Sequence, residues 1–172
     1  SRIFKVLSEN GLEEDAFKLL SKKGYNSFAF MWEKFDATTL WEVLPLGVYN
    51  ERSHNHPMQA GYDAWFYSGI GGITPQPDAP GFKKIIFKPY LTRQLESAET
   101  SYESGFGIIK SSWYHKNGNL LWEISIPENS EGKIFAPVYG EQADIKINGQ
   151  KIEIAEYNGD FVLVGEYSSG DY

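Results

Sequence analysis

Two short stretches in the first third of the chain combine residue types that bind and transform sugars. Ala37–Glu42 reads Ala-Thr-Thr-Leu-Trp-Glu, and an Asn-His pair places His56 fourteen positions after the glutamate. The indole of Trp41 offers a flat face for a sugar ring. The carboxylate of Glu42 can move a proton or accept hydrogen bonds from hydroxyls, and His56 adds a second polar contact. This combination favours a carbohydrate site.

Each of these residues also has a plainer interpretation. The loop from Phe35 to His56 is long and aromatic, which is typical of a functional loop, but a glutamate in a loop is more often a solvated charge than a catalyst. The indole of Trp41 can equally turn inward, and His56 can pack at a helix start. His54 and His56 have the spacing of a weak metal pair, but without a third ligand the sequence predicts no metal. Other charged residues are expected to be ion-paired or solvated rather than catalytic: Glu51, Arg52 and Asp63.

Composition bounds the class of protein. The 172 residues are 41% hydrophobic and 16% aromatic, which indicates a packed globular protein. Sixteen basic against twenty-three acidic residues give a net charge of −7 without any basic cluster, which argues against binding to nucleic acid or to an anionic membrane. The absence of cysteine excludes disulfides, thiolate metal sites and a cysteine nucleophile, but it leaves the compartment open. No apolar run approaches the roughly 20 residues that span a bilayer.

The elements that must position the candidate residues are short helices. Apolar residues recur at helical spacing within residues 3–7, 12–20 and 28–35, and Lys22, Lys23 and Gly24 are expected to close the second helix. A fourth helix should begin at Pro57, which suits a first helical turn. Its apolar stripe is expected to be core and comprises Met58, Tyr62, Trp65, Phe66 and Ile70.

After residue 81 the apolar period changes from that of a helix to that of a strand. Alternation runs clearly from Leu120 to Ile126, and Asn-Gly pairs at 117–118 and 148–149 are strong hairpin signals. Seven or eight strands imply a β-sandwich, with Trp113 and Trp122 in its core rather than on a glycan-binding surface. The predicted domains are helices over 1–71, a Pro-rich connector over 72–81 and the sandwich over 82–172.

Several of these stretches together resemble one known family. Ala37–Glu42, Asn55-His56, Gly71–Ile73 and the Pro-rich run through Ala79–Phe82 resemble the C-terminal part of the inverting bacterial α-L-rhamnosidases, which are six-hairpin glycosidases. The likeness runs in order from about Leu12 to about Pro137. The resemblance implies the last helices of an (α/α)6 toroid followed by an antiparallel β-sandwich.

The resemblance also implies roles for individual residues. In that family the glutamate that ends the Thr-Thr-x-Trp-Glu run is the general base, which falls on Glu42, and the histidine of the Asn-His pair contacts the sugar, which falls on His56. Trp41 is then a candidate sugar contact. The general acid of the family lies on earlier helices that this sequence does not include, so we expect the chain alone to be inactive. After Glu42 the family often continues with an aromatic or polar residue, whereas Val43-Leu44-Pro45 stands here, which affects the expected pocket shape.

The expected partners follow from the resemblance. They are a rhamnose-containing glycan or glycoside and an upstream portion of the same enzyme, with no metal or organic cofactor. Because Ser1–Lys5 reads like the inside of a helix and few helices are present, we expect a fragment whose apolar helix faces either meet that upstream portion or self-associate. The family favours a periplasmic or extracellular location, with the cytoplasm as the alternative. Three other functions stay open: a glycan-binding module, a purely structural sandwich, and a toroid glycosidase with another sugar specificity.

Overall fold

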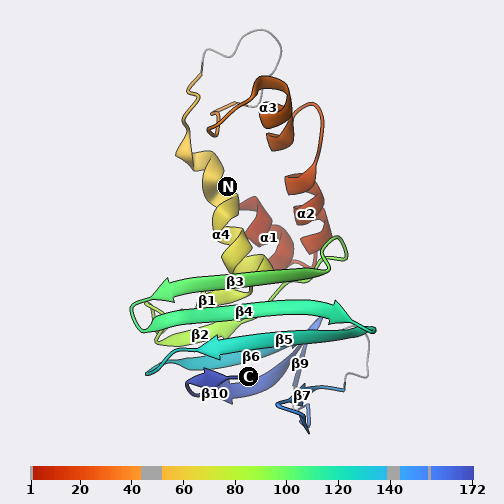
Figure 1. The fold of residues 1–172 in the computed structure, drawn as a ribbon, viewed down its shortest axis with the longest axis vertical. Helices are drawn as coiled ribbons and strands as arrows, with labels where there is room; N and C mark the ends of the chain where they lie inside the picture. The colour runs from red at the N-terminus through yellow and green to blue at the C-terminus, as the bar shows by residue number, and fades with distance from the viewer. Residues whose placement is uncertain (1, 44–51, 139–143, 155) are drawn as a thin grey trace. The chain divides into compact units, whose positions relative to one another are not determined.

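Helices come first along the chain and β-sheets follow, as the sequence predicts (Figure 1). The computed structural model describes residues 2–43, 52–138, 144–154 and 156–172. The chain divides into two compact units, Ser1–Trp65 and Phe66–Tyr172, which we describe one at a time as the helical unit and the β unit. The helical unit contains α1 (Ile3–Glu9), α2 (Glu13–Ser21), α3 (Phe28–Phe35), the 3₁₀ helix η1 (Pro57–Tyr62) and α4 (Asp63–Trp65).

The first two helices form the predicted hairpin. Gly11 takes a positive φ of 72° in the turn between them, a conformation that glycine adopts without steric cost. The second helix ends earlier than expected: α2 stops at Ser21 and Lys22 is already extended, with φ −54° and ψ 131°. Lys22 and Lys23 therefore lie beyond the helix, and Lys18 is the basic residue of its last turn.

A polar cap fixes the start of α3 where the sequence predicts it. Ser27 precedes the helix in an extended conformation, and its hydroxyl accepts a hydrogen bond of 3.1 Å from the backbone N–H of Phe30. The same hydroxyl donates to the carbonyl of Gly24 at 2.7 Å. At the other end Asp36 adopts a left-handed conformation with φ 49°, which terminates the helix. Both boundaries of α3 are therefore determined by local chemistry.

The predicted fourth helix is three short pieces of different pitch. Residues 57–62 are 3₁₀, 63–65 are α-helical, and η2 (Phe66–Ile70), which belongs to the β unit, is a π-helix. Because the number of residues per turn changes along the segment, the predicted stripe does not stay on one face. Trp65 and Ile70 are buried, whereas Met58 is 76% exposed. The expectation that the stripe is core stays a prediction, because it depends on helix faces that are expected to meet an upstream portion outside this chain.

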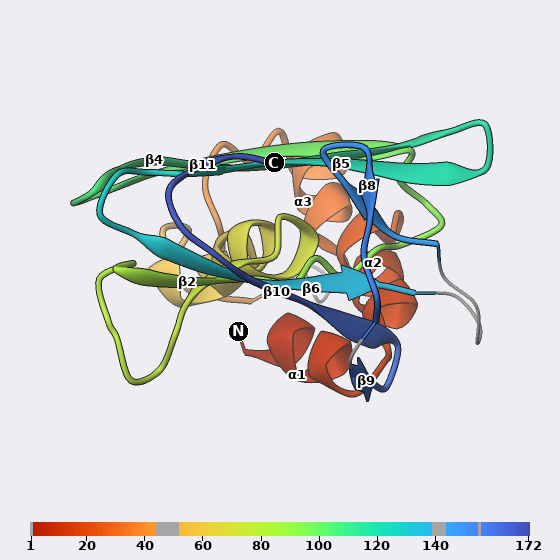
Figure 2. The same ribbon diagram turned by 90° about the horizontal axis from the view of Figure 1, so that it is seen from below.

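The β unit is a sandwich of two sheets, seen edge-on in Figure 2. One sheet has the strand order β1-β2-β6-β10-β9 and the other has the order β11-β5-β4-β3, while β7 and β8 form a small hairpin. All pairs are antiparallel except β2 with β6, which run parallel. The strands are β1 (Ile73–Pro75), β2 (Lys84–Phe87), β3 (Ser97–Ser104), β4 (Gly107–Lys116), β5 (Asn119–Ile126), β6 (Glu131–Pro137), β7 (Lys146–Ile147), β8 (Gln150–Lys151), β9 (Glu156–Asn158), β10 (Phe161–Tyr167) and β11 (Gly170–Asp171).

Part of the predicted connector is in fact a strand. Ile73–Pro75 forms β1, an edge strand that pairs with β2, and Ile73 is 3% exposed in the core. Proline is tolerated there because an edge strand has one side without a pairing partner. Residues 76–81 alone match the expected connecting role. The division into domains that the sequence suggests therefore stays a prediction, with the first strand of the sandwich starting earlier than expected.

The sandwich core is built from both sheets. Side chains from β1, β2 and β6 meet side chains from β4 and β5, with exposed fractions of 0–4%. Trp113 is fully buried in the same unit, as predicted. The buried cluster comprises Ile73, Ile85, Phe87, Ile109, Ile124, Ile126 and Ile134.

Candidate functional site

Hydrogen bonds tie the segment that ends at Glu42 to the segment that leads to His56. The backbone N–H of Glu42 donates to the carbonyl of Ser53 at 2.8 Å, and the N–H of His56 donates to the carbonyl of Leu40 at 2.7 Å. These bonds run like an antiparallel ladder and place both predicted site residues on one small scaffold of the helical unit. We call its two segments, residues 39–42 and 53–56, the paired loop. The tip between them, residues 44–51, lies outside the described residues and includes Leu44, Pro45 and Glu51.

Side chains reinforce the paired loop. The hydroxyl of Thr39 donates to the carbonyl of His54. The imidazole of His54 stacks on the indole of Trp41, with ring centroids 4.0 Å apart and an interplanar angle of 10°. Phe35 contacts the indole in a tilted arrangement at 5.6 Å. The two segments are therefore joined both through the backbone and through an aromatic stack.

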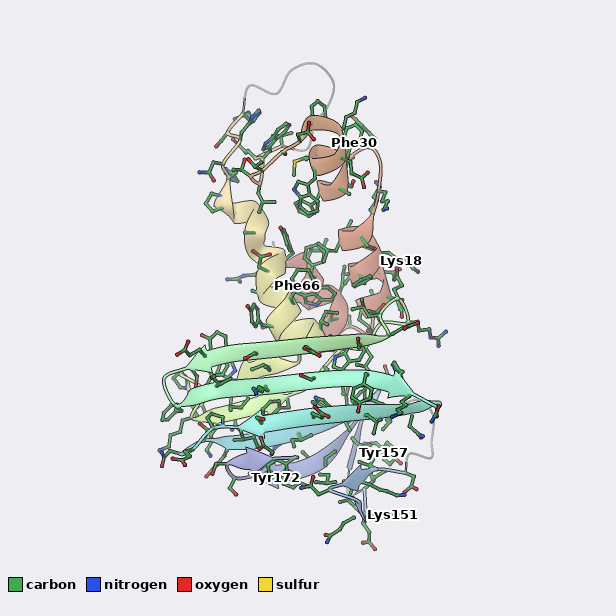
Figure 3. The ribbon with its side chains drawn as sticks, viewed as in Figure 1. Lys18, Phe30, Phe66, Lys151, Tyr157 and Tyr172 are labelled. Atoms are coloured by element: carbon green, nitrogen blue, oxygen red, sulfur yellow. The ribbon has the colours of Figure 1, made fainter. Side chains whose placement is uncertain are left out.

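Trp41 is mostly enclosed by these neighbours. It is 8% exposed, and the ring of Phe35 is in turn 5.8 Å from that of Phe30. Phe30 lies on α3 (Figure 3). Of the two interpretations that the sequence leaves open, inward packing is the one that this burial favours. Trp41 then supports the loop, and its role as a sugar contact stays a prediction.

The Glu42 carboxylate has a polar contact at each oxygen. Nη1 of Arg52 lies 3.7 Å from Oε1, and the backbone N–H of Ser53 donates to Oε2 at 3.3 Å. The Glu42 side chain is 31% exposed, so it is shielded in part and still reaches solvent. A carboxylate with one accessible edge can take a proton from a water molecule that approaches it. The sequence predicts Arg52 to be ion-paired or solvated, and it is both, since it pairs with Glu42 and is 70% exposed.

His56 precedes η1 and is half-buried. It occupies the N-cap position with φ −117° and ψ 92°, and its side chain makes no capping hydrogen bond. Its backbone is therefore engaged in the paired loop while its imidazole does not serve the helix end. The contact between His56 and a sugar stays a prediction.

Another aromatic contact of the helical unit lies at the end of η1. The ring of Tyr62 is 5.1 Å from that of Phe28. Burial, and then the charge of the neighbouring Asp63, raises the pKa of the Tyr62 hydroxyl above its ordinary value of 10.0. Tyr62 therefore stays protonated at neutral pH and can act only as a neutral hydrogen-bonding group.

The described residues hold no cluster of three or more His, Cys, Asp or Glu side chains that could bind a metal ion. Of the two histidines with the spacing of a weak metal pair, His54 stacks on Trp41. In the same part of the chain, no helix has the length and apolar character that crossing a membrane requires.

The tryptophans of the β unit act in packing. The indole N–H of fully buried Trp113 donates to the carbonyl of Ile70 at 2.8 Å. That of Trp122 donates to the hydroxyl of Ser111 at 2.9 Å, and its ring packs against the core. Both geometries satisfy the one polar group of the ring internally. They count against the use of these two rings as a glycan-binding surface.

The sequence does not predict the contacts that His54 and Arg52 make at the site. It presents His54 only as one member of a weak metal pair and Arg52 only as an ion-paired or solvated charge. Their partners, Trp41 and Glu42, lie across a loop without periodicity, so spacing could not indicate the contacts. The signal available was the alternation along 52–56, which places Arg52, His54 and His56 two residues apart.

Sequence models of two domain families match the chain in succession. Residues 1–70 match the bacterial alpha-L-rhamnosidase 6 hairpin glycosidase domain, and residues 72–150 match the bacterial alpha-L-rhamnosidase C-terminal domain. Among curated relatives, an alpha-L-rhamnosidase of Alteromonas sp. is 32% identical over 143 residues, which are 78% of this chain and 15% of the relative. An alpha-L-rhamnosidase of Formosa agariphila is 28% identical over 161 residues, 91% of this chain and 16% of the relative.

Solved structures give the same result. The alpha-L-rhamnosidase from Dictyoglumus thermophilum superposes with a TM-score of 0.87 and 34% identity, over 99% of this chain and 19% of that one. The Streptomyces avermitilis alpha-L-rhamnosidase, solved in complex with L-rhamnose, gives a TM-score of 0.75 at 22% identity over 99% of this chain and 16% of that one, which supports the fold.

The chain spans only 14–16% of the length of the curated relatives that it matches. The two domain models meet between residues 70 and 72, where the helical part of the sequence gives way to the β part. Both models describe consecutive parts of one kind of enzyme. The chain therefore belongs to the bacterial α-L-rhamnosidase family and corresponds to the end of its six-hairpin domain together with its C-terminal domain.

Proposed function

We propose that this chain supplies the general base, Glu42, of an enzyme that removes terminal α-L-rhamnosyl groups from glycans or glycosides with inversion at the anomeric carbon. The relatives named above are alpha-L-rhamnosidases, and one was solved with L-rhamnose. The observation that carries the proposal is the Glu42 carboxylate itself. It is held on the paired loop, contacted at both oxygens and 31% exposed.

The reaction needs two carboxyl groups on opposite sides of the glycosidic bond. One protonates the leaving oxygen while the C1–O bond breaks, and the other removes a proton from the water that attacks C1 from the opposite face, with roughly 6.5–9.5 Å between them. Glu42 takes the second role, in which the water proton passes to its carboxylate. The product is the free sugar with inverted anomeric configuration.

The remaining groups of the site have supporting roles in this proposal. His56, brought next to the Glu42 segment by the bond from its N–H to Leu40, orients a sugar hydroxyl or the attacking water. Trp41 contributes through the stack with His54, which stiffens the loop, and it is a candidate sugar contact. The general acid belongs to the portion of the enzyme outside this chain, so this chain alone should not hydrolyse an aryl α-L-rhamnoside.

The proposal is tested by Glu42→Gln in the complete enzyme. The amide keeps the shape of the side chain but cannot accept the water proton, so we expect turnover to fall by about 10²–10⁴-fold, the range that general base catalysis contributes. Glu33→Gln on α3 is the matched control, because it makes the same change at an exposed glutamate. Near-normal turnover of the Glu42 variant, with the control also active, would remove Glu42 from this role.

A further inference from the structure

Beyond the base itself, the structure points to the residue that orients it. We infer that Arg52 is a positioning residue, which acts on the reaction by holding the Glu42 carboxylate in one orientation. This inference rests on the proposed role of Glu42. It concerns a residue that lies outside the motifs that carry the family resemblance.

Two adjacent residues contact the Glu42 carboxylate, one at each oxygen. Arg52 approaches Oε1 with Nη1 at 3.7 Å, and Ser53 donates its backbone N–H to Oε2 at 3.3 Å. The Glu42 side chain is also 31% exposed, so solvent reaches the carboxylate that these two contacts hold. At 3.7 Å the guanidinium makes an electrostatic contact that is longer than a tight charge-assisted hydrogen bond, so it steers the carboxylate without saturating it.

The Arg52–Glu42 pair differs from the other ion pairs in the described part of the chain in how far its carboxylate side chain is exposed. In those pairs the carboxylate side chain is 50–66% exposed, whereas that of Glu42 is 31% exposed. Arg52 itself is 70% exposed, so the acid is the sheltered partner and the arginine reaches it from solvent. The pairs used for comparison are Lys5–Glu9, Lys18–Asp15, Lys84–Glu131, Lys133–Glu166 and Lys151–Asp144.

Orientation matters because a glutamate has several rotatable bonds. A free side chain samples many rotamers, and a base removes a proton only when an oxygen lies within hydrogen-bond reach of the water. Arg52 is joined directly to Ser53, whose carbonyl accepts the N–H of Glu42 at 2.8 Å. The backbone that carries the arginine is therefore directly joined to the scaffold that holds the backbone of the base. Exposed ion pairs contribute little to stability, so removing Arg52 should leave the fold intact.

The test uses Arg52→Ala and Arg52→Lys in the complete enzyme. We expect Arg52→Ala to lower kcat by about ten- to a hundredfold, the effect of a misplaced catalytic group, with KM nearly unchanged because the arginine does not touch the sugar. Arg52→Lys keeps the charge without the planar fork and should recover part of the loss. Arg2→Ala, which removes the same charge just before α1, is the matched control and should leave kcat unchanged.

A double-mutant cycle with Glu42→Gln tests whether Arg52 affects turnover through Glu42 or independently of it. If Arg52 acts through Glu42, Arg52→Ala should lower the residual turnover of the Glu42→Gln enzyme no further. An equal drop in both backgrounds would overturn the inference, as would wild-type kcat for Arg52→Ala alongside an impaired Glu42→Gln enzyme. If Glu42→Gln itself stays active, the proposed function fails and the inference fails with it. Thermal melting of each variant, with rates expressed per folded enzyme, separates these outcomes from unfolding.

Discussion

The two units of the chain differ in how completely they bury their large apolar side chains. In the β unit, the seven isoleucine and phenylalanine residues of the main cluster are 0–4% exposed, although seven other large apolar side chains of that unit are 38–53% exposed. Among the described residues of the helical unit, large apolar side chains at 42–76% exposure outnumber the buried ones. These exposed side chains are Ile3, Val6, Leu12, Leu19, Tyr25, Trp32, Phe35 and Met58.

This difference in apolar burial indicates which contacts stabilise each unit. Two sheets can bury both of their inner faces against each other, so the β unit has a core of its own. A few short helices have only narrow contacts and must bury their remaining faces elsewhere. The candidate site lies on the unit with the exposed faces. We therefore interpret the helical unit as the part whose core is completed by partners outside this chain, and the β unit as a self-sufficient body.

The largest expected difference between the units is in their thermal unfolding when each is produced without the other. Residues 66–172 alone should show a cooperative thermal transition, because their core comes from within that segment. Residues 1–65 alone should lack one or should associate, since a unit of that size with such apolar exposure is marginal. Differential scanning calorimetry and sedimentation velocity measure both properties. A monomeric 1–65 segment with a sharp transition would break the comparison.

A tryptophan in each unit offers a matched pair. Trp113→Ala removes a fully buried ring and leaves the Ile70 carbonyl without its donor, so it should cost about 3–5 kcal/mol in free energy of unfolding. Trp32→Ala on α3 removes a ring that is 42% exposed, and it should cost much less. Denaturant unfolding of the full chain compares them. Equal costs would mean that the helical unit is as well packed as the sandwich.

Two glycines, one in each unit, allow the packing around the backbone to be compared. Both have positive φ, +68° at Gly72 and +81° at Gly24. A Cβ on Gly72 would lie 2.2 Å from the backbone nitrogen of Pro89, whereas a Cβ on Gly24 would meet nothing within 4 Å. Gly24→Ala should therefore cost only the conformational strain of about 1–2 kcal/mol. Gly72→Ala should cost about 1–3 kcal/mol more through overpacking. A smaller cost for Gly72→Ala in denaturant unfolding would contradict the close approach of the two backbone segments.

Local chemistry explains the parts of the fold that the sequence predicts. Asn117-Gly118 and Asn148-Gly149 both adopt the paired positive φ angles of tight hairpin turns. The alternation along β5 correctly assigns Ile124 and Ile126 to the core. The cap at Ser27 sets the start of α3.

The missed elements lack such local signals. In β6 two of the inward positions are Gly132 and Ala136, which are too small to mark an apolar face, and β1 lies inside a Pro-rich stretch. The pitch changes along residues 57–70 depend on contacts that periodicity cannot reveal.

The site could be predicted only in part for a similar reason. Motif resemblance singles out Glu42 and His56, and the hydrogen bonds of the paired loop do bring their segments together. The contacts of Arg52 and His54 come from pairing between two irregular segments, for which the sequence has no period. Resemblance therefore indicates Glu42 and His56, and only the structure shows their neighbours.

The most direct test of the account is anion rescue of a Glu42→Ala variant in the complete enzyme. If Glu42 is the base, deleting its carboxylate leaves space on the face of the sugar from which water attacks, and azide can then attack C1 there without losing a proton. With an activated aryl α-L-rhamnoside, azide should restore turnover and give the β-configured rhamnosyl azide, since attack comes from the face that water uses. An α-configured azide, or activity of Glu42→Ala near that of the unmodified enzyme without azide, would contradict the assignment of Glu42 as the base.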